Sequence, residues 1–310
     1  MSRFTQDQLE TLLAAVDEGS FEAAARTLAI TPSAVSQRVK AMEQAAGRVL
    51  LQRSAPIRPT APGEVVLRLA RQVRLLDGEA ARELDGGAAA VPSLALAVNA
   101  DSLATWFLDA LVEVRRRADV VFDLHREDQD RTAALLRDGT VVAAVTAEGR
   151  PVQGCSSTPL GVDRYLAVAA PGFADRHLDG LGSERDVLER LDRLPLVDFD
   201  RADGLQQGFL RRVLGHDPRS PRHFVPSSAD FARAVELGLG WGLLPESQAL
   251  DAIGAGRLLE LAPGRHADVV LWWKRWNLRS ALLDETTAAV ARVAAARLRP
   301  VEPGGRTGVR

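Results

Sequence analysis

The chain of 310 residues is long enough for two or three domains of ordinary size. Its net charge of −2, with 46% hydrophobic and 26% charged residues, is typical of a folded protein with a substantial core. No stretch approaches the roughly 20 apolar residues of a membrane span, and the first segment carries acids unlike a signal peptide. The single cysteine, Cys155, excludes an internal disulfide and argues against structural zinc. We therefore expect a cytoplasmic protein with no metal, no cofactor and no membrane partner.

The segment 21–40 predicts two short helices joined by a tight turn. Thr31 can cap the second helix through its hydroxyl, and Pro32 fits the first helical position, where no amide hydrogen is needed. This helix would bury Val35 and Val39 and present small polar side chains, which suit the edges of bases in a DNA major groove. An ordinary helical hairpin with a solvated face is the alternative.

Basic residues gather in the same region. Residues 26–58 include six basic side chains and one acid, within a chain whose net charge is −2. A basic island in a slightly acidic protein is the footprint expected for contact with phosphates. The side chains expected to contact DNA are Arg26, Thr31, Ser33, Ser36, Gln37, Arg38, Lys40, Arg53 and Arg58.

Two short extended pieces follow at 49–53 and 57–60 and indicate a β-ribbon, or wing, beside the helices. Pro62-Gly63 is expected to break this pattern before a long helix over 64–84. Apolar residues in that helix fall at alternating steps of three and four, which is the spacing of a coiled-coil seam and favours a dimer contact over internal packing. The expected seam consists of Val66, Leu69, Val73, Leu76 and Ala80.

Strands and helices alternate beyond a linker of small residues at 86–93. Apolar runs at 94–98, 120–124 and 141–145, separated by amphipathic helices, predict a largely parallel sheet that is covered on both faces. The second half of the chain is therefore expected to be an α/β domain.

Three places at the ends of strands could receive a ligand, because ligands of open α/β sheets lie beyond the carboxyl ends of the strands. The first is the start of an expected helix over 102–116, where Asp101 or Ser102 can act as the N-cap or hold a ligand carboxylate. The second is the acidic pair 127–128, which could bind an ammonium group or be merely solvated. The third is the serine pair 227–228, which could equally cap a helix.

The N-terminal block resembles LysR-type transcriptional regulators. Residues 31–43, Thr-Pro-Ser-Ala-Val-Ser-Gln-Arg-Val-Lys-Ala-Met-Glu, match the family's recognition segment nearly residue for residue, and Thr60-Ala61-Pro62-Gly63 fills its Thr-x-x-Gly junction. The proline-rich wing at 54–59 departs from the family pattern. The resemblance implies an α/β protein with an N-terminal all-α winged helix-turn-helix, a linker helix and a two-lobed effector domain like that of periplasmic binding proteins.

The same resemblance implies the domain limits. The winged helix-turn-helix would occupy 1–60, the linker helix and hinge 61–90, the effector-binding domain 91–299 and a flexible tail 300–310. In the effector domain, lobe I would combine 91–162 with 268–299, and lobe II would span 163–267.

Within the family, the run Asn-Ala-Asp-Ser-Leu-Ala-Thr-Trp at 99–106 resembles the ArgP/LysG branch, whose members respond to lysine or arginine and activate basic amino-acid exporters. It implies an effector with one carboxylate and two cationic groups, L-lysine or L-arginine. The implied partners are double-stranded promoter DNA, a second copy in a homodimer or tetramer, and RNA polymerase. The implied effector-binding residues are Asn99, Asp101, Ser102, Trp106, Glu127, Asp128, Thr146, Asp200, Ser227 and Ser228.

Other classes of protein fit the sequence less well. It lacks H-E-x-x-H, G-x-S-x-G and P-loop motifs, and its five histidines are scattered, so no catalytic residue is expected. A plain solute-binding protein would not need the DNA-binding block, and an architectural DNA protein would not need two lobes. A LysR-type regulator that responds to a different small carboxylate remains the alternative.

Overall fold

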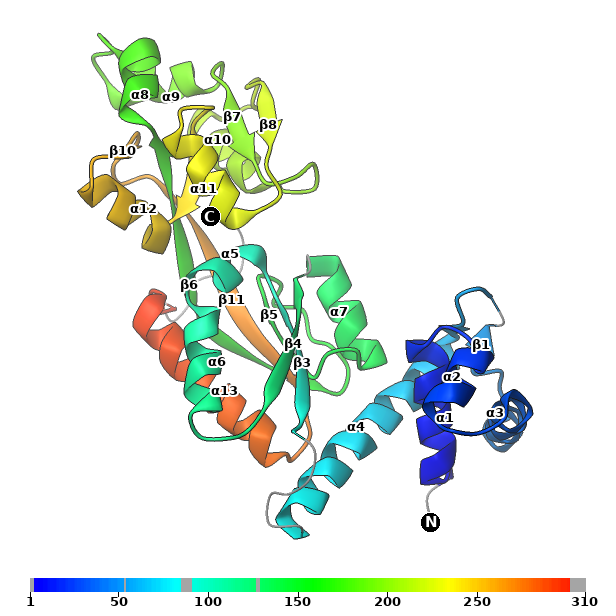
Figure 1. The fold of residues 1–310 in the computed structure, drawn as a ribbon. Coiled ribbons are helices and arrows are strands. Elements are labelled where there is room, and N and C mark those ends of the chain that lie inside the picture. The colour runs from blue at the N-terminus through cyan, green and yellow to red at the C-terminus, as the bar shows by residue number, and fades with distance from the viewer. Residues whose placement is uncertain (1–2, 53, 85–90, 127–128, 302–310) are drawn as a thin grey trace.

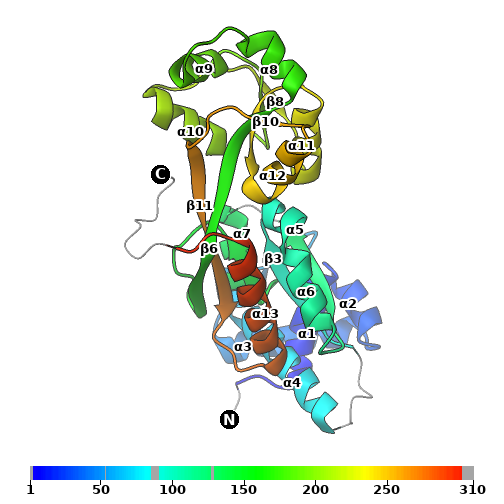
Figure 2. The ribbon, with the colours of Figure 1, turned by 90° about the vertical axis from the view of Figure 1, so that its left-hand side faces the viewer.

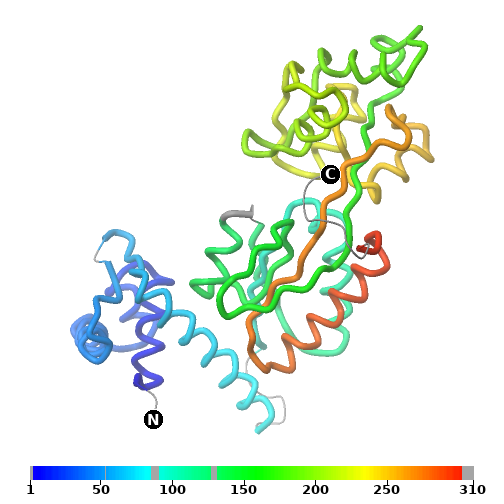
Figure 3. The backbone as a smooth tube through the Cα atoms, turned by 180° about the vertical axis from the view of Figure 1, so that it is seen from behind, coloured from blue at the N-terminus to red at the C-terminus, as the bar shows by residue number. Residues whose placement is uncertain are grey.

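The structure, a computed structural model, describes residues 3–52, 54–84, 91–126 and 129–301. A small helical domain is joined by one long helix to a two-lobed α/β domain, as Figures 1 and 3 show from opposite sides. Each part has its own cluster of buried apolar side chains. The expected fold class is therefore confirmed.

The N-terminal domain forms the expected helix pair and wing. Thr31 Oγ1 accepts a hydrogen bond from the amide of Ala34 at 3.1 Å, and Pro32 is the first helical residue. Val35 and Val39 are buried in the core of the domain. The two short strands of the wing pair antiparallel. The elements are α1 (Gln6–Asp17), α2 (Phe21–Thr27), α3 (Pro32–Ala46), β1 (Leu51–Gln52) and β2 (Arg58–Pro59).

The long helix α4 (Ala61–Leu84) begins earlier than expected, so the predicted break at Pro62-Gly63 is wrong. Thr60 Oγ1 accepts a hydrogen bond from the amide of Gly63 and thereby caps the first turn, where proline is tolerated. A Cβ atom on Gly63 would lie 1.9 Å from the carbonyl oxygen of Leu50. Glycine is therefore needed here for close approach to the wing, not to end a helix.

Lobe I contains a parallel arrangement of three strands flanked by helices. The expectation of one helix over 102–116 is wrong, because the structure has two helices that are separated at Trp106. The backbone of Trp106 leaves helical geometry, with φ −133° and ψ −23°. The Trp106 indole is buried edge-on against Phe107 in the core of the lobe. The elements are β3 (Ser93–Val98), α5 (Ala100–Thr105), α6 (Phe107–Arg115), β4 (Val121–Arg126), α7 (Gln129–Asp138), β5 (Ala143–Thr146) and α13 (Ala281–Arg297).

Two long antiparallel strands, β6 (Cys155–Ala169) and β11 (His266–Trp276), run from one lobe into the other (Figure 2). They lie inside one sheet with the order β10-β6-β11-β5-β3-β4, and β9 also pairs with β6. The expectation of a largely parallel sheet is therefore wrong. Among the strands named here, parallel pairing occurs between β3 and its neighbours β4 and β5 and between β7 and β8. The other pairs of the large sheet, including β6 with β11, are antiparallel.

Lobe II packs its helices around the far ends of β6 and β11. Trp241 is fully buried at its centre, and the indole Nε1 donates a hydrogen bond to the carbonyl of Leu191 at 3.2 Å. The elements are α8 (Pro171–Leu178), α9 (Glu184–Leu191), β7 (Leu196–Asp198), α10 (Leu205–Leu214), β8 (Arg222–Phe224), α11 (Ser228–Glu236), β9 (Gly242–Pro245), α12 (Glu246–Gly254) and β10 (Leu259–Glu260).

Candidate functional sites

Helix α3 lies at the outer edge of the N-terminal domain, away from the lobes (Figure 1). Its outward face exposes Ser33, Gln37 and Lys40, while Ser36 is half-buried. These side chains include amide, hydroxyl and ammonium groups that can bond to base edges and phosphates. The exposed face of α3 therefore has the chemistry expected of a recognition helix.

The basic residues that were expected to contact DNA lie in different environments in the structure. Arg26 on α2 and Arg58 on β2 are exposed, whereas Arg53 lies outside the described residues. Arg38 turns toward α1, where Nη2 lies 3.1 Å from Asp7 Oδ2 and Nη1 donates to the Thr11 hydroxyl. Through these two contacts, Arg38 joins α3 to α1.

Glu43 has a role in this domain that the sequence reasoning missed. Its Oε1 accepts hydrogen bonds from the backbone amides of Leu50 at 2.9 Å and Leu51 at 3.4 Å. The carboxylate therefore holds the start of the wing against the end of α3. The sequence did contain a signal for this role, because Glu43 is the one acid within the basic segment 26–58.

The expected seam on α4 is shared between two environments. Val66 is 8% exposed and lies in the core of the N-terminal domain, and Val73 packs against the same core. Leu69 and Leu76 are 40% and 39% exposed, and Ala80 is also exposed. Val66 and Val73 therefore serve this chain's own core, whereas Leu69, Leu76 and Ala80 are exposed and open to a partner.

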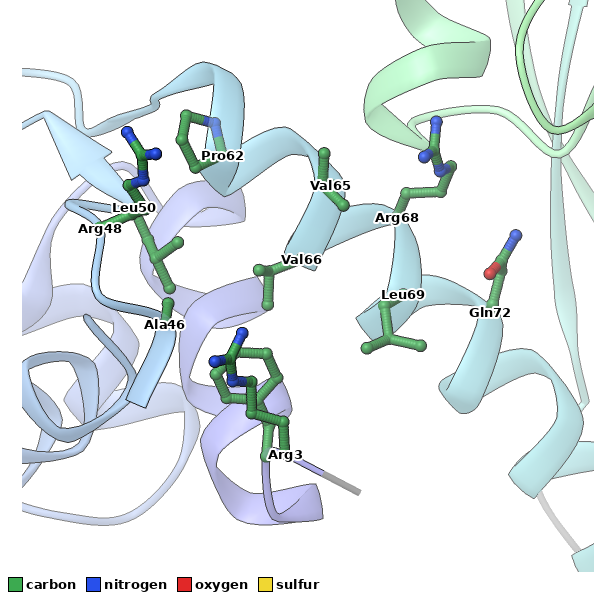
Figure 4. A pocket seen from close by; sticks show the side chains of 11 residues that line it. Arg3, Ala46, Arg48, Leu50, Pro62, Val65, Val66, Arg68, Leu69 and Gln72 are labelled. Carbon is green, nitrogen blue, oxygen red and sulfur yellow. The ribbon is translucent and has the colours of Figure 1, made fainter. Parts of the chain in front are cut away.

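A surface groove of about 650 Å³ lies between α4 and the N-terminal domain. Figure 4 shows Leu69 of α4 on one side and Arg3 on the other, and Arg48 also contributes to the lining. The groove therefore adjoins the exposed part of the seam.

The carboxyl ends of the three parallel strands meet at one edge of lobe I. Val98 pairs with Val145 of β5 and with Arg126 of β4, so Asn99 and Thr146 follow neighbouring strand ends. Thr146 is buried, and its hydroxyl accepts from the amide of Glu148. The acidic pair 127–128 lies outside the described residues.

The N-cap of α5 is Asn99, so the expectation that Asp101 or Ser102 caps this helix is wrong. The helix begins two residues earlier than expected, at Ala100, which places both side chains inside it. Asn99 Oδ1, Ser102 Oγ and Trp106 Nε1 are buried and have no hydrogen-bond partner among the residues that the structure describes. Buried polar atoms normally find partners, so these three atoms indicate a site for a ligand or water.

An acidic cluster adjoins these atoms. Asp101 Oδ2 accepts a hydrogen bond from the Tyr165 hydroxyl at 2.7 Å, which joins α5 to strand β6. Burial, followed by the nearby Asp101 carboxylate, raises the pKa of Asp163 to about 8. Burial and the Asp101 and Asp163 carboxylates also raise the pKa of Tyr165 well above its ordinary value, so the phenol stays protonated. The sequence reasoning missed Asp163 and Tyr165.

Lobe II adds further acids. Asp198 is fully buried, and burial, followed by the charge of Asp203, raises its pKa to about 6. Burial also raises the pKa of Asp203. With its amide assigned so that the nitrogen faces the acids, Gln206 donates to Asp198 at 3.3 Å and to Asp203 at 3.1 Å. Asp200 instead bonds to backbone amides of its own loop.

The serine pair lies at the start of α11, which packs against α5. Ser227 is the N-cap of α11, as its structural interpretation predicted. Ser228 is buried, and its hydroxyl accepts a hydrogen bond from Gln248 at 3.2 Å. Next to this pair, the Arg126 guanidinium of lobe I donates to the carbonyl of Pro226 at 3.3 Å. The two lobes therefore touch beside the site.

Three further observations limit the chemistry of the described residues. No three of their histidine, cysteine or acidic side chains are grouped so that they could hold a metal ion. Cys155 is half-buried, and burial raises the pKa of its thiol to about 11, which keeps the thiol protonated. No helix within the described ranges is both long and apolar enough to cross a membrane.

Both parts of the chain match known families. Residues 6–64 match the bacterial regulatory helix-turn-helix protein of the lysR family, and residues 87–295 match the LysR substrate binding domain. The chain belongs to the LysR family of DNA-binding transcriptional regulators, which are not enzymes.

Within this family the chain is a member of the LysG/ArgP group. It is 44% identical to the lysine export transcriptional regulatory protein LysG of Corynebacterium glutamicum over 299 residues, which cover 94% of this chain and 99% of the relative. Full-length LysG from Corynebacterium glutamicum with bound effector arginine is similar with a TM-score of 0.80 and 41% identity, covering 96% of this chain and 100% of that one. ArgP from Mycobacterium tuberculosis gives a TM-score of 0.86 and 40% identity, with coverage of 95% and 98%.

Proposed function

We propose that this regulator senses L-lysine or L-arginine between its two lobes and controls the transcription of a basic amino-acid exporter gene. It acts in the cytoplasm on promoter DNA, as a homodimer or a tetramer, and changes how RNA polymerase engages the promoter. The relative from Corynebacterium glutamicum is named for lysine export, and its structure was solved with effector arginine.

One observation carries the choice of effector: acids from both lobes gather beside buried polar atoms that have no partner among the described residues. Asp101 lies in lobe I, Asp163 on the connecting strand β6 and Asp203 in lobe II, and the Asp101 charge acts on both of the others. Carboxylates favour cationic groups through charge-assisted hydrogen bonds. The Ser102 hydroxyl and the Trp106 indole Nε1–H would donate hydrogen bonds to the effector carboxylate.

The proposed effector contacts are those implied by the sequence, with additions. Asp163, Tyr165 and Asp203 join them, and Asp200 Oδ1 also accepts hydrogen bonds from two backbone amides of its own loop. Glu127 and Asp128 remain part of the proposal on sequence grounds. The domain limits expected from the sequence, including the hinge near residue 90, are retained as well.

The proposed DNA contacts are the exposed polar residues of α3 together with basic residues of α2 and the wing. The proposed dimer contact uses Leu69, Leu76 and Ala80, which α4 leaves exposed. A dimer would present two copies of α3 to two half-sites about one DNA turn apart. An effector can alter this placement only if it binds one arrangement of the lobes more tightly than another.

Calorimetric titration of the full chain tests the effector. L-lysine and L-arginine are expected to bind, whereas L-norleucine and L-citrulline, which lack the distal charge, are expected to bind at least tenfold more weakly. Ser102→Ala and Asp101→Asn should weaken binding of L-arginine, with Asp230→Asn, an exposed acid of α11, as the matched control. Equal binding of charged and uncharged amino acids would contradict the proposal.

A further inference from the structure

The strands that join the two lobes carry a buried carboxyl group whose acidic neighbours oppose its ionisation. Asp163 lies on β6, where it pairs with Val269 of β11 between the two lobes. Its side chain is 5% exposed, and Oδ2 has no hydrogen-bond partner among the described residues. A buried carboxyl oxygen without a partner indicates that the partner is a ligand or solvent.

The titratable groups that face Asp163 come from three elements. Tyr165 lies on the same strand, Asp101 on α5 and Glu246 on α12. Glu246 is already paired with Arg299, whose Nε donates to Oε2 at 2.9 Å. The Tyr165 hydroxyl donates to Asp101 and also favours the ionised form of Asp163, although it carries no charge. The negative charges that act on Asp163 are those of Asp101 and of Glu246, and Asp101 has the larger effect.

Burial and two neighbouring negative charges both disfavour the ionised form of Asp163. They raise its pKa to about 8, so that the carboxyl group holds a proton at neutral pH. The unpartnered atoms Asn99 Oδ1 and Ser102 Oγ lie close in the chain to Asp101, so buried polar atoms without a partner occur beside this carboxylate as well. A cation that enters there would reverse the balance, since it favours the ionised form.

We propose that Asp163 accepts the cationic group of the effector and that effector binding releases the proton of the Asp163 carboxyl group to solvent. This proposal rests on the proposed function, because it requires a basic amino acid in the site. It makes the response of the regulator depend on pH as well as on effector concentration.

The size of the effect follows from the linkage between proton and ligand binding. A group with a pKa of about 8 carries about 0.9 proton at pH 7, so binding at that pH should release about 0.9 proton. The apparent affinity for L-arginine should rise about eightfold between pH 7 and pH 8.5 if the group is ionised in the complex. Asp198, with a pKa of about 6, is mostly ionised throughout this window.

The test is calorimetry with L-arginine, whose guanidinium stays charged in this range, in buffers of different ionisation enthalpy at pH 7. The slope of observed heat against buffer enthalpy counts the protons released. We expect about 0.9 for the unaltered chain and for Asp175→Asn, an exposed acid of α8, and less than about 0.2 for Asp163→Asn. The pH dependence of affinity should flatten in Asp163→Asn.

The possible failures are distinct. Binding of L-arginine without proton release, or proton release that persists in Asp163→Asn, would overturn this inference and leave the proposed effector in place. No binding of either basic amino acid would overturn the proposed function, and this inference with it. If Asp163→Asn does not fold, the pH dependence of proton release by the unaltered chain takes its place: release that falls off near pH 8 supports Asp163, and release that falls off near pH 6 assigns the proton to Asp198 and overturns the inference.

Discussion

Arg71 connects the three parts of the molecule, and its removal should separate effector binding from the DNA-binding domain. It lies on α4 with a side chain that is 13% exposed. Nη2 lies 3.0 Å from Asp17 Oδ1 of α1, and Nη1 donates to the carbonyl of Asp138 at 2.9 Å and the hydroxyl of Thr140 at 3.4 Å, just beyond α7. Helix α7 starts close to the site between the lobes, so this guanidinium joins the far end of α7 to the DNA-binding domain.

The contribution of these contacts can be estimated from their burial. The bond from a charged donor to the half-buried Asp138 carbonyl contributes about 1.5 kcal/mol, and the weaker hydroxyl bond about 0.5 kcal/mol. The ion pair with Asp17, whose side chain is 42% exposed, contributes about 0.5 kcal/mol after solvent screening. Arg71→Ala should therefore weaken this junction by about 2.5 kcal/mol, which is a factor of about 70 in the equilibrium between docked and separated parts.

Hydrogen exchange and an operator-binding assay measure the two consequences. Arg71→Ala should speed amide exchange at 136–140 and in the last turn of α1, while affinity for L-arginine stays within about twofold of the original chain. The effector-induced change in the DNA complex should shrink to less than half. Arg74→Ala, an exposed arginine of the same helix, is the control. Unchanged exchange together with an unchanged effector response would refute the reasoning.

Three further outcomes are expected. Gln37→Ala should reduce the difference in binding free energy between operator and random DNA by about 1–3 kcal/mol. Arg58→Ala should weaken binding to operator and to random DNA alike, and should lower the slope of log affinity against log salt concentration by about 1. Equal losses of operator and random binding in both variants would contradict these roles. Glu43→Ala should destabilise the chain by about 1–3 kcal/mol in chemical denaturation, because two wing amides lose their acceptor, and an unchanged midpoint would argue against that role. Without effector, Asp163 keeps its proton in the folded state up to a pKa of about 8, whereas in the unfolded chain it loses the proton above its ordinary pKa. The free energy of unfolding should therefore fall as pH rises toward about 8, by up to about 1.4 kcal/mol per pH unit. Asp163→Asn should remove this slope, and a slope that persists would contradict the burial argument.

The N-terminal domain was predictable because its signals are local. Thr31 and Pro32 specify the start of α3 through a side-chain cap and a fixed φ angle, and both work within one turn. The start of α4 was not predictable in the same way. From the sequence, Gly63 is expected to break a helix. In the structure, its lack of a side chain instead allows the Leu50 carbonyl to approach α4 closely.

The effector site was predictable in part for the same reason. The strand ends that place Asn99 and Thr146 together follow from alternating strands and helices. Asp163 and Tyr165 on the connecting strand β6 could not be found in this way, because β6 pairs with β11 across about a hundred residues of sequence. Only the fold reveals that Tyr165 meets Asp101.

The central claim is that one chain binds operator DNA through α3 and responds there to a basic amino acid held between its lobes. The most direct measurement is footprinting of the full chain on its promoter with L-arginine, with L-citrulline and without either. We predict that the protected region or its bend changes with L-arginine and not with L-citrulline. Identical protection under all three conditions, at saturating amino acid, would contradict the claim.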